Sequence, residues 1–152
     1  MYTSGEDCSV ISWNISKGTQ LETFKIGNDK PTCLAVLSES KSLIVGVREL
    51  KQWSVNTNSF DLKHVFTGHT SNVNILKCLN LSDDEYVLST SKKDRTVALW
   101  NTSAGQKNAA ATFLMADVAY FISCAMYGQR LEVVAVTRSG VAHIFILEDI
   151  TK

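Results

Sequence analysis

The sequence contains little proline and no excess of either charge. Pro31 is its only proline, and 15 Lys and Arg residues balance 15 Asp and Glu residues, so the formal net charge is zero. Proteins that grip nucleic acid through its phosphates usually carry a basic excess, so only a local basic patch could serve that purpose here. No apolar run approaches the roughly 20 residues that cross a membrane, and residues 1–7 lack the charged and apolar regions of a secretory signal. We therefore expect neither membrane contact nor secretion.

Motifs of metal sites and enzymes are also missing. The four cysteines stand far apart and form no C-x-x-C pair for zinc or redox chemistry; they are Cys8, Cys33, Cys78 and Cys124. This pattern predicts reduced, mostly buried thiols of an intracellular protein. No nucleophile motif, phosphate-binding glycine loop or dinucleotide fingerprint is found. We predict a protein that is not an enzyme and uses no cofactor, no metal and no small-molecule substrate.

Short runs rich in β-branched and aromatic residues, separated by Gly, Asn, Asp, Ser and Lys, fill the chain. This pattern is typical of an all-β protein built from hairpins. The predicted strands are Val10–Ile15, Gln20–Ile26, Thr32–Leu37, Ser42–Val47, Leu50–Val55, Lys63–Phe66, Val73–Leu79, Tyr86–Thr90, Thr96–Asn101, Ala110–Met115, Tyr120–Met126, Leu131–Thr137 and Val141–Leu147.

Two landmarks repeat along the chain with a similar period. An aromatic residue closes each third strand at Trp13, Trp53, Trp100 and Phe145, at spacings of 40, 47 and 45 residues. Three of the cysteines, at positions 33, 78 and 124, are spaced 45 and 46 residues apart. The period matches the ~40–45 residues of a four-stranded propeller blade. We therefore predict an all-β, partial propeller of about three and a half blades, at about 1–30, 31–70, 71–117 and 118–152.

One blade carries a recognisable polar motif. Residues 66–69 read Phe-Thr-Gly-His, and residues 90–100 lead from Thr90 through Asp94 to Trp100. This stretch resembles a WD repeat. The resemblance implies a hydrogen-bonded set of His69, Thr90, Asp94 and Trp100. Such a set is physically reasonable, because a buried indole N–H, a hydroxyl and an imidazole each need a partner.

The first blade repeats part of the motif. Thr3 and Asp7 stand ten and six residues before Trp13, as Thr90 and Asp94 do before Trp100. The matching Gly-His turn would precede residue 1, and complete propellers of the family usually have seven blades. We therefore expect the chain to begin inside a blade, to be part of a longer propeller, and to associate through its bare ends when isolated.

The other two blades depart from the motif. No Asp stands in the turn before Trp53, where Val-Arg-Glu predicts a shortened hairpin, and Phe145 replaces the tryptophan after a Ser139-Gly140 turn. These blades are expected to rely on apolar packing alone.

The order of these features is similar to one family in particular. Val-Ile-Ser-Trp-Asn, Val-Arg-Glu-Leu-Lys-Gln-Trp, Val-Phe-Thr-Gly-His, Ser-Lys-Lys-Asp-Arg-Thr-Val-Ala-Leu-Trp and Val-Thr-Arg-Ser-Gly-Val-Ala-His-Ile-Phe follow one another. Together they resemble the family of transcription-coupled WD-repeat subunits of the nucleolar small-subunit processome (U-three protein homologues). The resemblance implies a nucleolar scaffold in pre-rRNA transcription and processing, which joins other WD-repeat subunits and, within the complex, pre-rRNA.

Several residues allow a second interpretation. His69 and Asp94 fit a structural turn better than a metal or catalytic site, and Asp83-Asp84-Glu85 lacks the glycine and later glutamate of a calcium loop. Lys92, Lys93 and Arg95 could contact RNA phosphates or simply be solvated. As an alternative function, a generic WD-repeat adaptor, such as a substrate receptor or chromatin-associated protein, would bind a peptide or protein at the channel mouth. A direct RNA binder is the third possibility.

Overall fold

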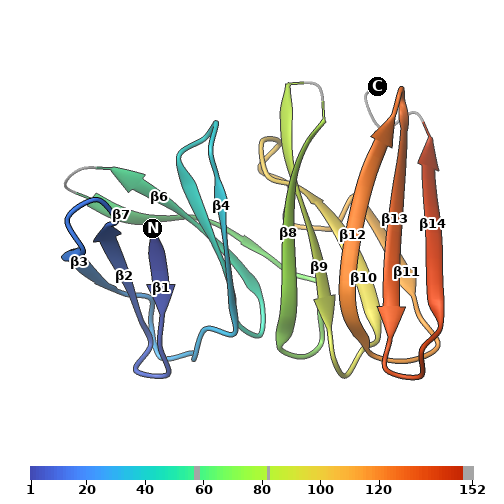
Figure 1. Ribbon diagram of the computed structural model, residues 1–152, viewed down its shortest axis with the longest axis horizontal. Helices are drawn as coiled ribbons and strands as arrows, with labels where there is room; N and C mark the ends of the chain where they lie inside the picture. The colour runs from blue at the N-terminus through green and yellow to red at the C-terminus, as the bar shows by residue number, and fades with distance from the viewer. Residues whose placement is uncertain (57–58, 82, 149–152) are drawn as a thin grey trace.

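A computed structural model describes residues 1–56, 59–81 and 83–148 of the 152-residue chain. These residues form fourteen strands in four antiparallel sheets (Figure 1). The first sheet contains β1 (Tyr2–Ser4), β2 (Ser9–Asn14) and β3 (Thr19–Lys25). The second contains β4 (Cys33–Leu37), β5 (Ser42–Gly46), β6 (Leu50–Asn56) and β7 (Ser59–Phe66). The third contains β8 (Val73–Leu81), β9 (Asp84–Ser91), β10 (Thr96–Asn101) and β11 (Ala111–Leu114). The fourth contains β12 (Ala119–Tyr127), β13 (Arg130–Thr137) and β14 (Ala142–Glu148).

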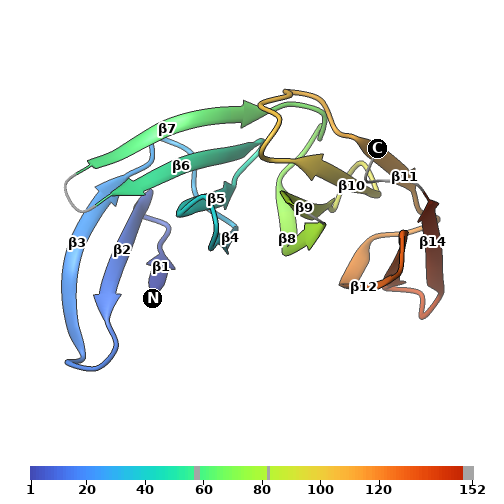
Figure 2. The same ribbon diagram turned by 90° about the horizontal axis from the view of Figure 1, so that it is seen from above.

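The sheets stand side by side around an arc. Figure 2 shows this arrangement from above, with β4 and β8 on the inner side of the arc and β3 and β7 on its outer side. Within each sheet the strands follow chain order, because each antiparallel strand is joined directly to its neighbour in the sheet. The four sheets are therefore blades of a partial β-propeller, as the repeat period predicted.

Apolar side chains fill the space between consecutive blades. One cluster, which includes Val10 and Val45, joins the first and second blades, and another, which includes Phe66 and Trp100, joins the second and third. A third cluster, which includes Leu99 and Leu131, joins the third and fourth. Strands of the middle blades are accordingly buried on both faces, whereas β14 alternates between half-buried and exposed residues. This explains why periodicity along the middle strands is weak.

The predicted strands agree with the observed ones to within a few residues, with one omission. Strand β1 was not predicted, because its three residues are too few to show a pattern. The third-strand aromatics lie at corresponding places: Trp53 is opposite Leu43, Trp100 opposite Val87, and Phe145 opposite Val133.

The expectation of mostly buried cysteines was wrong in degree. All four thiols are free, and each residue is only partly buried. Cys33, Cys78 and Cys124 lie on β4, β8 and β12, the first strands of their blades, whose residues are less fully covered than those of β5 and β9. No helix in the described part of the chain is long and apolar enough to cross a membrane.

Candidate functional site

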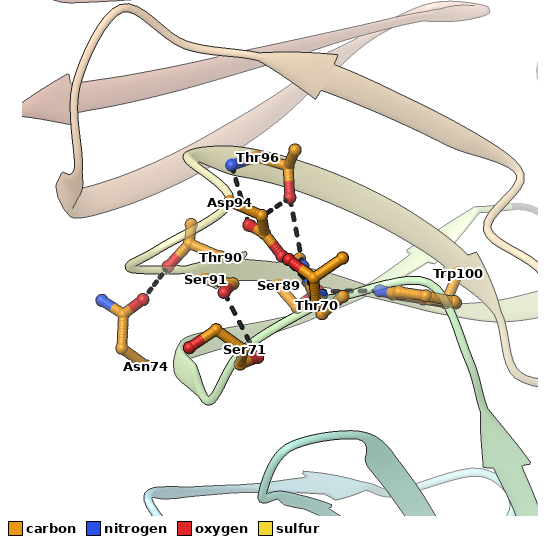
Figure 3. A network of polar contacts seen from close by, with 10 residues as sticks. Thr70, Ser71, Asn74, Ser89, Thr90, Ser91, Asp94, Thr96 and Trp100 are labelled. Carbon is orange, nitrogen blue, oxygen red and sulfur yellow. Dashed lines mark hydrogen bonds and ion pairs between the residues drawn. The ribbon is translucent and has the colours of Figure 1, made fainter.

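A network of polar side chains links the connection between the second and third blades to the third blade itself (Figure 3). The Nε1–H of Trp100 donates to Oγ of Ser89 at 2.7 Å, and Ser89 contacts Nε2 of His69, also at 2.7 Å. Nδ1 of His69 lies 3.1 Å from Oδ2 of Asp94. Because the Asp94 carboxylate only accepts, Nδ1 carries the proton of a neutral His69, and Nε2 therefore accepts from the Ser89 hydroxyl.

Asp94 completes the network by fixing two turns. Its Oδ2 accepts the backbone N–H of Thr70 at 2.9 Å, and its Oδ1 accepts the hydroxyl of Thr96 at 2.8 Å and the Thr96 N–H at 3.2 Å. Arg95, between Asp94 and Thr96, has a φ of 54°, a left-handed backbone conformation that residues other than glycine rarely adopt. The carboxylate thus holds both the His69 connection and the β9–β10 hairpin in place.

Burial and hydrogen bonding set the charges of this pair. Burial lowers the pKa of His69, and the neighbouring Asp94 carboxylate, which raises it, offsets this only in part. Burial raises the pKa of Asp94, but hydrogen bonds from Thr70 and Thr96 and the neighbouring His69 together outweigh burial and hold the pKa below its ordinary value. The pair therefore consists of a neutral imidazole beside an ionised carboxylate, and its hydrogen bonds hold the two connections together.

The structure corrects one member of the predicted set. It brings together His69, Asp94 and Trp100, but the hydroxyl between them belongs to Ser89 and not to Thr90. Thr90 lies opposite Val97 and points to the other face of the sheet, where its hydroxyl donates to Oδ1 of Asn74 at 3.0 Å. Neighbouring strand residues face opposite sides, so an error of one position changes the partner completely.

The first blade explains how that error arose. Nε1–H of Trp13 donates to Oγ1 of Thr3 at 2.8 Å, and Asp7 accepts the hydroxyl of Ser9 at 2.7 Å, which lowers the pKa of Asp7. Thr3 corresponds to Ser89, because each pairs with the residue two places before its tryptophan. The β1–β2 hairpin is one residue shorter than the β9–β10 hairpin, so the residue that corresponds to Thr3 lies eleven places before Trp100 and not ten. Thr3 is exposed, whereas Ser89 and Trp100 are buried.

In the second and fourth blades the hydroxyl position is apolar. The register places Val45 of β5 and Ala135 of β13 where Ser89 stands in β9. Consequently, Nε1 of Trp53 is buried without a hydrogen-bond partner among the described residues. The fourth blade has Phe145, which needs none. The polar residues that sequence reasoning missed are Ser89 and Thr96; the run Ser89-Thr90-Ser91 signalled a hydroxyl but not which one.

The predicted basic cluster divides in two. Lys92 and Lys93 line a groove of about 570 Å³ together with residues of the β3–β4 and β7–β8 connections. Arg95 does not line this groove, since its Nη1 donates to the carbonyl of Ala116 at 3.1 Å.

Three of the four cysteine thiols have raised pKa values. Burial raises the pKa of Cys33 and of Cys78 to about 11, and burial also raises that of Cys124, so these thiols stay protonated near neutral pH. No three His, Cys, Asp or Glu residues in the described ranges lie close enough to hold a metal ion.

Comparisons with known proteins agree with this geometry. The family described as "WD domain, G-beta repeat" matches residues 60–101. Autophagy-related protein 16 of Arabidopsis thaliana is 26% identical over 105 residues, which are 69% of this chain and 20% of that protein. An uncharacterised WD repeat-containing protein of Schizosaccharomyces pombe is 25% identical over 103 residues, 66% of this chain and 27% of its own length. The chain thus spans about a quarter or less of the curated relatives it matches.

Solved propellers share the fold at lower identity. The WD40 β-propeller domain of Doa1 superposes with a TM-score of 0.76 and 20% identity, and the match covers 99% of this chain and 47% of that domain's chain. U3-55K gives a TM-score of 0.68 with 21% identity, over 95% of this chain and 47% of its own. The RRP9 WD40 repeats give a TM-score of 0.69 with 22% identity, and the match covers 95% of this chain and 46% of that chain. The chain therefore has the fold of a partial β-propeller, and its residues 60–101 match a WD repeat.

Proposed function

We propose that the chain is a non-enzymatic scaffold that binds protein partners through the loops at one face of its propeller. The observation that carries this proposal is the network around Asp94. The network holds the His69 connection and the β9–β10 hairpin in fixed positions, while Lys92 and Lys93 of that hairpin remain exposed. Loops held by a rigid sheet framework are where such proteins place their binding residues.

The chemistry of the buried groups supports a role without catalysis. The only His–Asp pair among the described residues is occupied by structural hydrogen bonds on both ring nitrogens. Cysteines with raised pKa values make poor nucleophiles near neutral pH.

For its place in the cell, we propose a role in ribosome biogenesis as a component of the nucleolar small-subunit processome. The support is the order of the motifs, which resembles transcription-coupled WD-repeat subunits along nearly the whole chain. The likeness to U3-55K and RRP9 concerns the fold alone. In this role the chain joins other WD-repeat subunits, and pre-rRNA lies within the same complex.

Localisation and co-purification test this role directly. A tagged chain, expressed in cells of its source, is expected to gather in the nucleolus and to co-purify with other WD-repeat processome subunits and pre-rRNA. Ser89→Ala, which disrupts the network, serves as a comparison for dependence on the folded blade. Exclusion from the nucleolus together with a different, reproducible set of partners would contradict the processome role and favour a generic WD-repeat adaptor.

A further inference from the structure

The groove beside Lys92 and Lys93 crosses three blades. Pro31 and Thr32, before β4, form one part of its lining, and Ser71 and Asn72, before β8, form another. Glu6 of the β1–β2 hairpin and the two lysines of the β9–β10 hairpin border it. Its volume of about 570 Å³ lies within the roughly 300–1,000 Å³ typical of ligand sites.

Hydrogen bonds hold several of the residues that line this groove. The Thr32 hydroxyl donates to the carbonyl of Val73, and the Ser91 hydroxyl donates to the carbonyl of Ser71 at 3.2 Å. The Asn74 amide donates to the carbonyl of Ala119 at 3.3 Å and accepts from the Thr90 hydroxyl at 3.0 Å. A ligand would therefore meet a preformed surface, which lowers the entropic cost of binding.

The charge of the groove is unbalanced. Glu6 forms an exposed ion pair with Lys30 at 3.0 Å, so the one carboxylate beside the groove has a positively charged neighbour of its own. Lys92 and Lys93 are exposed and form no ion pair with any described residue. Two unpaired ammonium groups beside neutral amide and hydroxyl groups favour a ligand with closely spaced negative charges.

We propose that this groove binds an acidic segment of a protein partner in an extended conformation. The inference rests on the proposed function as a protein-binding scaffold and specifies the chemistry of the partner. The lysines attract the acidic side chains, and the exposed Asn72 side chain offers a donor and an acceptor to the peptide backbone. RNA fits less well, because no aromatic residue lines the groove to stack on bases.

The test uses the full 152-residue chain and a fluorescent eight-residue peptide of alternating Glu and Ser. Fluorescence anisotropy is expected to show binding that weakens as salt rises, whereas the same peptide with Gln for Glu does not bind. Oligouridine of eight nucleotides is titrated in parallel, both alone and as a competitor.

Two pairs of charge reversals locate the site. Lys92→Glu with Lys93→Glu is expected to weaken peptide binding by roughly tenfold or more, since two favourable contacts become unfavourable. The matched control, Lys17→Glu with Lys63→Glu, changes the net charge equally at exposed residues away from the groove and is expected to leave binding unchanged. Circular dichroism of both variants verifies that they fold.

Each outcome decides the matter. Peptide binding that depends on Lys92 and Lys93 supports the proposal. No peptide binding, equal weakening in both variant pairs, or displacement by oligouridine with the same lysine dependence overturns it, and the last result would assign the groove to RNA. Failure of the processome role would appear separately, as a wild-type chain outside the nucleolus, and would not change the peptide titration.

Discussion

The second and third blades carry a tryptophan at the same position, but only the tryptophan of the third blade has a hydrogen-bond partner for its N–H among the described residues. In the third blade, Trp100 is 1% exposed and its N–H reaches Ser89, which continues through His69 to Asp94. In the second, the N–H of Trp53 is buried beside Val45 and has no partner among the described residues. The two blades share a fold and neighbouring positions but not a polar network.

The second blade offsets this deficit with aromatic packing. The Trp53 ring stacks on Phe60 at a centroid distance of 4.7 Å, and Phe60 stacks on Phe24 of the first blade at 4.4 Å. Each such pair contributes about 0.5–1.5 kcal/mol beyond the area it buries, whereas an unsatisfied buried donor costs about 1–3 kcal/mol. In this chain, a blade keeps its fold with a stacked aromatic residue and without the polar network around it.

Removing the shared hydroxyl should have the largest effect. Ser89→Ala leaves both the Trp100 N–H and Nε2 of His69 unsatisfied in a buried site, so we expect a loss of about 2–4 kcal/mol in the free energy of unfolding. Denaturant titration measures it. Ser91→Ala on the same strand, which removes one hydrogen bond, is the control and should cost about 1 kcal/mol. Equal costs would show that the network has no special weight.

The junction between the two blades should come next. Glu85, 3% exposed, accepts the backbone N–H groups of Glu39 at 2.9 Å and Ser40 at 3.0 Å, across from the third blade to the second. Glu85→Gln is expected to cost about 1.5 kcal/mol, because charge-assisted bonds to two donors become one neutral bond. Asp83→Asn makes the same charge change at an exposed residue and should be neutral. Similar unfolding midpoints for the two variants would argue against an inter-blade link.

Giving the second blade a hydroxyl should change the free energy of unfolding by less than the two preceding variants, and in the stabilising direction. Val45→Thr places a hydroxyl where Ser89 stands in the third blade, next to the unpartnered Trp53 N–H, and we expect a stabilisation of about 1 kcal/mol. Val133→Thr, beside Phe145, adds a hydroxyl near a ring without a donor and should destabilise by about 1–3 kcal/mol. A destabilised Val45→Thr variant would mean that the register equivalence is wrong.

The pH dependence should be the smallest difference. The lowered pKa of His69 means that the unfolded chain takes up this proton first, so stability is full above pH 6.5 and falls as the pH drops below it. The lowered pKa of Asp94 adds a further loss below pH 3.8. Unfolding midpoints at pH 7 and pH 5 should therefore differ less in His69→Gln than in wild type. If His69→Gln left the difference between the two midpoints unchanged, His69 would not be the source of the pH dependence.

The fold could be predicted because its signals are periodic. Aromatics and cysteines repeat at blade length, and turn residues separate runs of strand formers, so each blade repeats the same information. Three-residue β1 escaped, because a pattern needs more residues than that strand contains.

Details of the polar network depend on register, which the sequence specifies less directly. Ser89, Thr90 and Ser91 are chemically similar neighbours, and only the length of the β9–β10 hairpin decides which of them faces Trp100. The groove at Lys92 and Lys93 could not be predicted from the sequence either, because its lining residues come from connections far apart in the chain.

Hydrogen exchange of the three tryptophan indole N–H groups, followed by NMR, measures whether Ser89 protects Trp100 as the polar network requires. We expect the Trp100 N–H to exchange most slowly and the Trp13 N–H, next to exposed Thr3, to exchange fastest. Ser89→Ala should accelerate exchange at Trp100 and leave exchange at Trp13 unchanged. If the Trp53 N–H were protected as strongly as that of Trp100, or if Ser89→Ala left exchange at Trp100 unchanged, the protective role of the Ser89 hydroxyl would be wrong.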